Sequence, residues 1–262
     1  NKMIQNYIDT HAHIFSLEFH DDFDAVIARA HDAGVYRMMI VTTDEEEALQ
    51  AIEFAKKDPV HYQVAYGIHP EYVKDATSEK LRKLEEIISK KEITAVGEIG
   101  MDLYYESDTR EAQKELFIYQ IELAKKYNKP ILVHSRDAMQ DTYDIMKEHH
   151  VRGLLHCFSG SAEMAVEFTK LGYYIALGGA ATFKNARHAL EVCKAIDMKY
   201  LLSETDCPYM APVPVRGTRN EPCNIPYIVD VLAKTRDISV EEMANTIDEN
   251  YKRFLKEINE SN

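Results

Sequence analysis

The stretch Asp9-Thr-His-Ala-His13 follows a short apolar run and places two histidines one residue apart. On an extended strand, residues i and i+2 point to the same face, so the imidazoles of His11 and His13 would aim at one point. Two neutral imidazoles that converge from the end of a rigid strand make half of a transition-metal site. The stretch therefore predicts a fold whose strand ends gather metal ligands, and the rest of the chain should supply the others.

Short β-type runs alternate along the chain with longer amphipathic segments. The predicted strands cover residues 4–9, 37–42, 62–67, 94–98, 131–134, 153–157, 173–177 and 200–204. The predicted helices cover residues 23–32, 45–57, 79–90, 110–127, 138–149, 163–171, 185–195, 225–234 and 240–259. Eight strands that alternate with helices over 262 residues favour a (β/α)8 TIM barrel, formed by one domain over residues 1–262. A doubly wound open sheet alternates in the same way, but no G-x-G-x-x-G motif follows the first strand.

The composition is that of a soluble globular protein, with 45% apolar and 29% charged residues. No apolar run approaches the ~20 residues that span a bilayer, and no signal-peptide pattern opens the sequence. The four cysteines form no C-x-x-C pair, so we expect reduced thiols in a cytoplasmic protein. No membrane association and no obligate protein partner is indicated.

The charge balance is acidic, with 31 basic and 44 acidic residues and a net charge of −13. Such a surface disfavours avid, non-specific binding of duplex DNA through phosphate neutralisation. It does not exclude a substrate that carries phosphate, because bound divalent cations would reverse the sign of the charge locally.

In a TIM barrel, active-site residues lie at the C-terminal ends of the strands. Six residues of ligand type stand where predicted strands end, and they are His11, His13, Glu98, His134, His156 and Asp206. Any one of them alone has an ordinary structural explanation, such as a hydrogen-bonded histidine or a turn aspartate. Four imidazoles and two carboxylates on one face of a barrel instead favour a centre for two adjacent divalent ions with one carboxylate shared.

Other residues near these strand ends are candidates for binding a substrate. Arg136 lies two residues beyond His134, so its guanidinium could hold a phosphate in two hydrogen bonds, although an ion pair with Asp137 is the alternative. Ser159 and Gly160 lead into the sixth helix, whose first N–H groups favour an anion. His69 closes the third strand and could face the cavity or serve as a turn residue before Pro70.

The long loop after the eighth strand, residues 208–226, adds Arg216 and Asn220 as further candidates, with a loop-pinning role equally open. Glu204 is better placed to orient a ligand histidine than to bind metal, and we assign a similar supporting role to Asp102.

Several motifs, taken together, resemble the TatD family of metal-dependent deoxyribonucleases, within the amidohydrolase superfamily. They are Ile8-Asp-Thr-His-Ala-His13, Gly67-Ile-His-Pro70, Gly97-Glu-Ile-Gly-Met-Asp102, Pro130-Ile-Leu-Val-His-Ser-Arg136, His156-Cys-Phe-Ser-Gly160, Glu204-Thr-Asp-Cys-Pro208 and Arg216-Gly-Thr-Arg-Asn-Glu-Pro222.

The resemblance implies two divalent metal ions in a barrel. One ion would be held by His11, His13 and Asp206. The other would be held by His134 and His156, with Glu98 bridging in the place that a carbamylated lysine takes in many amidohydrolases.

The implied activity is hydrolysis of DNA phosphodiester bonds by a metal-activated water, with Asp206 and Glu98 as the catalytic carboxylates. A barrel mouth suits a strand end, so we expect a 3′–5′ exonuclease on single-stranded or frayed ends. The alternatives are hydrolysis of another ester or amide, such as a lactone or aminoacyl ester, and a metal-bound interaction protein without catalysis. Mixed imidazole and carboxylate ligands leave Zn, Mg, Mn, Co and Fe open.

Overall fold

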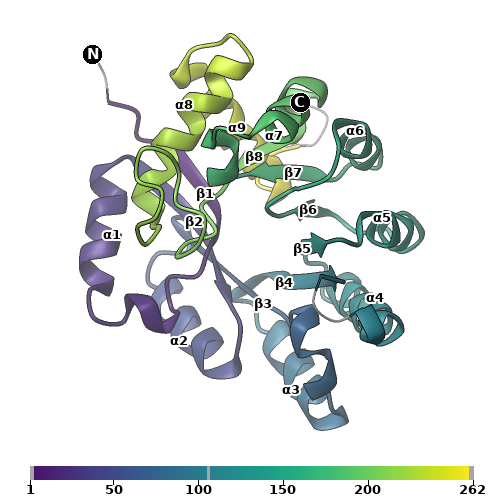
Figure 1. The fold of residues 1–262 in the computed structure, drawn as a ribbon. Helices are drawn as coiled ribbons and strands as arrows, with labels where there is room; N and C mark the ends of the chain where they lie inside the picture. Colours follow the sequence, from purple (N-terminus) through teal and green to yellow (C-terminus); the bar gives the residue numbers. More distant parts are fainter. Residues whose placement is uncertain (1–2, 105–106, 260–262) are drawn as a thin grey trace.

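A computed structural model describes residues 3–104 and 107–259, and its centre is one sheet of eight strands in sequence order (Figure 1). The strands are β1 (Tyr7–Ala12), β2 (Val35–Thr42), β3 (Tyr62–Tyr66), β4 (Ile93–Asp102), β5 (Ile131–Arg136), β6 (Gly153–Leu155), β7 (Tyr174–Leu177) and β8 (Leu201–Ser203). Each strand pairs in parallel with the next one along the chain. At the seam, where β1 meets β8 and the barrel closes, the Thr10 hydroxyl donates to the Ser203 carbonyl at 3.0 Å. The His13 N–H donates to the Cys207 carbonyl, also at 3.0 Å. The predicted (β/α)8 TIM barrel is confirmed.

The helices surround the sheet and connect its strands (Figure 1). They are α1 (Phe23–Asp32), α2 (Glu45–Ala55), α3 (Ser78–Ile88), α4 (Arg110–Lys126), α5 (Met139–Glu148), α6 (Ala162–Lys170), α7 (Arg187–Ala195), α8 (Ile225–Thr235) and α9 (Val240–Phe254). Asp44, Thr77, Ser161 and Ser239 cap α2, α3, α6 and α9 by accepting a backbone N–H of the first turn. Thr109 occupies the cap position of α4, but its hydroxyl accepts from the Gln113 amide instead.

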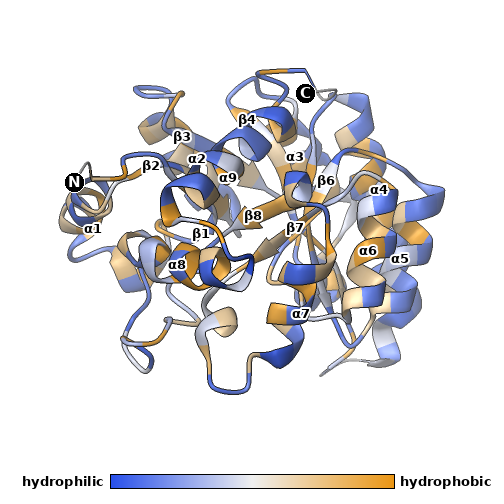
Figure 2. Ribbon diagram, turned by 90° about the horizontal axis from the view of Figure 1, so that it is seen from above, coloured by the Kyte–Doolittle hydropathy of each residue, from blue (hydrophilic) through white to orange (hydrophobic). Residues whose placement is uncertain are grey.

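The apolar core lies between the strands and the inner faces of the helices, while the outer helix faces are polar (Figure 2). β4 and β5 pack closely. A Cβ atom on Gly97 would lie 2.5 Å from the Cβ of Leu132, so only glycine fits there without displacing the neighbouring strand. None of the described helices is both long and apolar enough to cross a membrane. All four cysteines are described, and each is a free thiol.

Two strand boundaries differ from the sequence prediction in a way that matters for the site. β1 begins at Tyr7 and contains His11, whereas the prediction ended this strand at residue 9. β4 continues to Asp102, so Glu98 lies inside the strand. The prediction that the strand ends at Glu98 is therefore wrong. The pairing of β4 with β5 shifts register between Gly97 and Ile99, which interrupts the ladder at Glu98 and lets the strand continue beyond it.

Candidate metal centre

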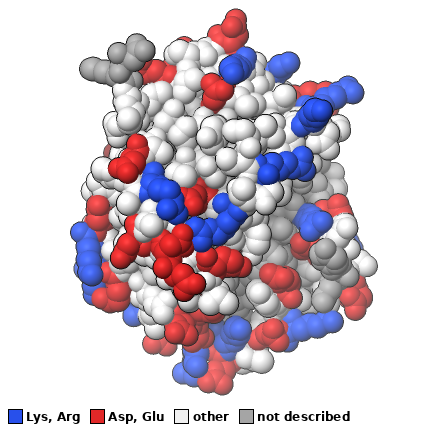
Figure 3. Space-filling model, turned by 60° about the vertical axis from the view of Figure 1, so that its left-hand side comes forward, with Lys and Arg blue, Asp and Glu red and all other residues white. Residues whose placement is uncertain are grey.

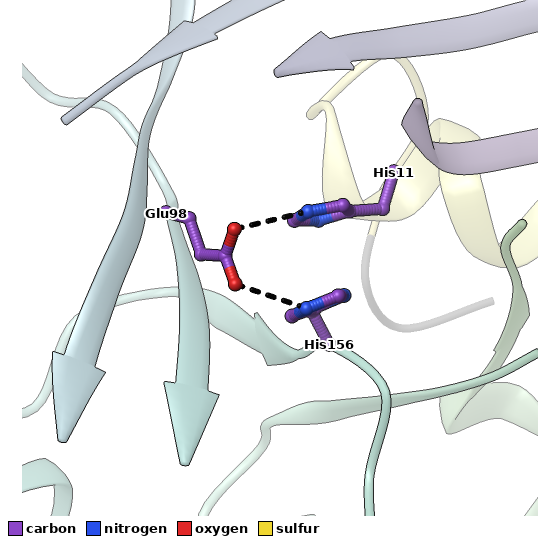
Figure 4. Close-up of side chains that lie close together, drawn as sticks. All are labelled: His11, Glu98 and His156. Atoms are coloured by element: carbon purple, nitrogen blue, oxygen red, sulfur yellow. Dashed lines mark ion pairs between the residues drawn. The ribbon is translucent and has the colours of Figure 1, made fainter. Parts of the chain in front are cut away.

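The Glu98 carboxylate lies at the middle of a buried cluster of histidines, and its two oxygens face different partners. Oε2 lies 3.3 Å from His11 Nε2 and 3.8 Å from His13 Nε2. Oε1 lies 3.0 Å from His156 Nε2 and 3.1 Å from His134 Nδ1. Figure 4 shows one oxygen directed at His11 and the other at His156, whose rings stack with centroids 3.6 Å apart. The side chain therefore has the position that a bridging carboxylate requires.

His11 of β1 and His13, the residue after the strand's end, converge as the strand period predicts. Their Nε2 atoms are 3.1 Å apart. Asp206, just beyond β8, places its Oδ1 3.7 Å from His11 Nε2 and 3.5 Å from His13 Nε2. Three ligand-type side chains from opposite ends of the sequence thus meet on the Oε2 side of Glu98.

Two carboxylates outside this cluster fix the orientation of the remaining histidines. Asp102 Oδ2 lies 2.9 Å from His134 Nε2, and Glu204 Oε2 lies 3.0 Å from His156 Nδ1. Each contact occupies one ring nitrogen and leaves the other directed at Glu98. The supporting roles expected for Asp102 and Glu204 agree with these positions.

Two buried residues without a predicted role, Asp9 and Gln113, support the cluster. Asp9 accepts hydrogen bonds from the His11 N–H at 3.1 Å and from the N–H and hydroxyl of Thr205 at 2.9 and 2.6 Å. It therefore ties β1 to the segment that carries Asp206. Gln113 of α4 exchanges two hydrogen bonds with the backbone of Asp102. The only signal for Asp9 was an acidic residue within an apolar strand, and nothing marked Gln113.

Burial and mutual charge shape the electrostatics of the cluster. Burial lowers the pKa of His11 to about 4, so this imidazole is neutral near pH 7. Burial opposes ionisation of Glu98 and Asp206, but the surrounding imidazoles outweigh it and lower the pKa of both carboxyls. Burial likewise opposes protonation of His134, yet its hydrogen bonds to Asp102 and Glu98 raise its pKa to about 9. Burial opposes protonation of His156 as well, but the carboxylates of Glu204, Glu98 and Asp206 raise its pKa. Protonated imidazoles therefore compensate the buried carboxylates, and a divalent cation bound to the same nitrogens would replace those protons.

The donor set fits divalent metal ions. Three groups of three residues each place their ligand atoms within 4.8 Å of one another, and they are His11–His13–Asp206, His11–Glu98–His156 and His69–Glu98–His134. Imidazole nitrogens 3.1 Å apart that face the same carboxylates need a proton or a cation between them. Imidazole and carboxylate ligands in such numbers are typical of Zn²⁺ and related divalent ions.

The cluster forms the floor of an open cavity of about 650 Å³. Three of the predicted substrate contacts, Arg136, His69 and Ser159, line it. The Arg136 guanidinium carbon lies 3.7 Å from the ring centroid of Tyr104. His69 Nδ1 accepts the Glu71 N–H at 3.1 Å, and its Nε2 lies 3.7 Å from Glu98 Oε1. His69 is thus brought beside the predicted ligands.

Three other predicted substrate contacts are not among the described residues that line this cavity. Asn220 is fully buried, and its amide donates to the carbonyls of Thr205 and Tyr209. Arg216 lies over the ring of Phe183, 3.7 Å from its centroid. Gly160 stands next to Ser159, where a Cβ atom would meet the Phe158 ring at 2.8 Å. The positions of Asn220 and Arg216 fit the loop-pinning alternative better than a substrate contact.

Known proteins that resemble this chain in sequence and structure are metal-dependent hydrolases and TatD homologues. The family model described as TatD related DNase matches residues 8–256. YabD of Bacillus subtilis, an uncharacterized metal-dependent hydrolase, is 39% identical over 251 residues, which is 95% of this chain and 98% of YabD. YcfH of Escherichia coli K12, described in the same words, is 35% identical over 256 residues and 95% of each chain. The crystal structure of YjjV, a TatD homologue from Escherichia coli K12, matches with a TM-score of 0.89 and 30% identity, over 96% of this chain and 98% of YjjV.

Proposed function

The chain belongs to the TatD family of metal-dependent hydrolases, and we propose that it cleaves phosphodiester bonds of DNA, releasing nucleotides from the 3′ ends of single-stranded or frayed strands. The observation that carries the proposal is the position of Arg136 beside the metal-ligand cluster. Arg136 extends from the end of β5, two residues beyond His134, and lines the same cavity. A guanidinium beside a cluster of metal-ligand type is suited to a substrate that carries an anionic phosphate at the scissile bond.

The side chains of the cluster have two further roles, binding the metal ions and orienting the ligands. Glu98, Asp206 and the histidines of the cluster would hold the divalent ions. Bound there, such ions supply Lewis acidity that lowers the pKa of water from about 15.7 towards about 7. Asp102 and Glu204 keep His134 and His156 oriented through the hydrogen bonds described above.

Asp206 is the residue best placed to accept the proton of the attacking water. Its side chain is 16% exposed, lines the cavity and reaches His13 at 3.5 Å. The oxygen of water forms a bond to phosphorus, the bond from phosphorus to the 3′ oxygen of the preceding nucleotide breaks, and that oxygen takes up a proton. Arg136 holds a non-bridging phosphate oxygen, where negative charge increases in the transition state.

Hydrolysis of a lactone or an aminoacyl ester is the competing proposal, since the same centre could activate water against a carbonyl group. Such substrates present no phosphate to Arg136. The effect of removing the guanidinium therefore separates the two substrate classes.

The test begins with protein stripped of metal by a chelator and reloaded separately with Zn, Mg, Mn, Co or Fe. It is assayed on a single-stranded oligonucleotide labelled at its 5′ end, on a frayed duplex and on a lactone. We expect chelation to abolish cleavage, and at least one metal to restore a ladder of products shortened from the 3′ end.

Arg136→Ala should lower kcat/KM on DNA by about 10- to 100-fold, because hydrogen bonds to a charged group are lost, and should leave lactone hydrolysis unchanged. Arg187→Ala is the matched control, since Arg187 is exposed on α7 and pairs with Glu191. Equal losses on DNA and lactone would contradict the role of Arg136. Intact DNA after treatment with every metal-loaded form would remove the proposal.

A further inference from the structure

Three exposed tyrosines stand around the mouth of the cavity. Tyr72, Tyr104 and Tyr209 are 42%, 52% and 56% exposed. They follow β3, β4 and β8, so all three belong to the face of the barrel where the strands end. Single exposed aromatic residues are common on protein surfaces, whereas a group at the rim of a functional cavity is not explained by chance exposure.

Each of these rings neighbours a side chain that lines the cavity. The Tyr209 ring centroid lies 6.2 Å from that of His13, and the Tyr72 centroid lies 6.4 Å from that of His69. Tyr104 stacks on the Arg136 guanidinium. Tyr72 and Tyr209 themselves form part of the cavity wall. Tyr72 and Tyr209 therefore each neighbour a histidine of the candidate centre, and Tyr104 neighbours an arginine that lines the same cavity.

We propose that Tyr72, Tyr104 and Tyr209 form a stacking rim that holds the unpaired bases of a single-stranded DNA end while its phosphate lies at the metal centre. This inference rests on the proposed function and identifies the part of the DNA that the protein recognises, the unpaired bases. Every base has a flat π face, and stacking on an aromatic ring is tolerant of sequence. The stacked Arg136–Tyr104 pair presents a cation and a ring at one point, which suits a phosphate with its adjoining base.

The charge distribution favours stacking over electrostatic attraction as the source of affinity. Arg136 is the one arginine or lysine among the described residues that line the cavity, where Glu47 and Glu71 also lie. On the face shown in Figure 3, acidic side chains lie close beside basic ones and no broad basic surface faces the viewer. Binding that depends on phosphate neutralisation needs many such cations. A duplex keeps its base faces covered, so a single-stranded end is the form that can use the rim.

The backbone around the rim is held in place by hydrogen bonds. The Tyr209 N–H donates to the Asp206 carbonyl at 3.0 Å, and the Tyr209 carbonyl accepts from the buried amide of Asn220 at 2.8 Å. The Tyr104 N–H donates to Asp102 Oδ1 at 3.0 Å, on the carboxylate that also orients His134. Rings on a fixed backbone lose less freedom when they bind, which strengthens stacking.

The test compares two 5′-labelled single strands of equal length. One carries thymine throughout, and the other carries abasic deoxyribose at its 3′-terminal positions, so that both offer the same phosphates. We expect the metal-loaded enzyme to show a KM about 10-fold or more lower for the strand with bases, with a similar kcat for both.

Tyr72→Ala and Tyr209→Ala should each raise KM for the base-bearing strand towards the abasic value and leave cleavage of the abasic strand unchanged. Tyr209→Phe should retain the preference, because stacking does not need the hydroxyl group. Tyr119→Ala is the matched control, since Tyr119 is 36% exposed on α4 and does not line the cavity. A second readout is fluorescence anisotropy of the same strands with metal-free protein, in which the two rim variants should weaken binding of the base-bearing strand alone.

Equal KM values and equal binding of the two strands by the unaltered protein would overturn the rim while leaving the proposed function standing. The rim would also be overturned if Tyr119→Ala changed the preference as much as Tyr209→Ala does. If neither strand is cleaved by any metal-loaded form, the proposed function fails and the rim, which rests on it, fails with it.

Discussion

Glu98 is the residue on which the site depends, because each of its oxygens serves a different set of nitrogens. Oε2 faces His11 and His13, and Oε1 faces His134 and His156. A carboxylate buried to 7% exposure among four imidazoles is costly unless its charge is compensated. Divalent ions on both sides of it would provide that compensation and would explain why the imidazoles point inward.

Asp102→Asn tests how far the carboxylates behind the histidines support this centre. Asparagine keeps the size of the side chain but loses the charge that pairs with His134 Nε2 at 2.9 Å. We expect metal affinity to fall by about 10- to 100-fold, as is typical when such a supporting carboxylate is removed. Competition with a chromophoric chelator measures the affinity directly. Asp108→Asn, at an exposed residue near the start of α4, serves as the control, and an Asp102→Asn affinity equal to that of the control would contradict the supporting role.

At the scale of elements, the segment between β8 and α8 joins the site to the outside of the barrel. Arg219 pairs with Asp22 at 2.7 Å, and Arg29 of α1 pairs with Glu221 at 2.6 Å. These ion pairs fasten the segment beside α1, as the ribbon in Figure 1 also shows. Asn220 fastens its inner side through the Thr205 carbonyl. The segment therefore holds both Asp206 and Tyr209 in fixed positions.

Asn220→Ala should destabilise the fold, because the buried Thr205 carbonyl and the part-buried Tyr209 carbonyl lose their donor. We expect the free energy of unfolding of the metal-free protein to fall by about 1–3 kcal/mol, measured by urea denaturation. Asn245→Ala removes an asparagine that is exposed and bonded to Asn6, and should change stability by less than about 0.5 kcal/mol. Equal stability of the two variants would show that Asn220 does not hold the segment.

The elements also show what the sequence could and could not predict. Hydrophobic periodicity located α1 at its observed bounds, because its apolar positions face the core at helical spacing. The same reasoning ended β4 at Glu98, since polar residues usually mark the end of a buried strand. The strand continues because its next residues pair with β5. Such pairing depends on a neighbour far along the chain, and no local pattern reports it.

At the scale of the whole molecule, the barrel explains how residues nearly 200 positions apart can share one pocket. The seam between β1 and β8 places Asp206 beside His11, and its backbone N–H donates to the His11 carbonyl at 2.8 Å. That the six candidate ligand side chains would gather on one face was predictable, because a parallel barrel brings its strand ends together there. The orientation of each imidazole was not predictable. It depends on hydrogen bonds to partners such as Asp102 and Glu204, and only the folded chain brings these carboxylates within reach of the rings.

The most direct test of the central claim is anomalous diffraction from crystals of the manganese-loaded protein. We predict two peaks about 3.5–4 Å apart, one on each side of Glu98. The first should lie beside His11, His13 and Asp206, and the second beside His134 and His156. A single peak, or two peaks of which neither contacts Glu98, would contradict the bridged centre.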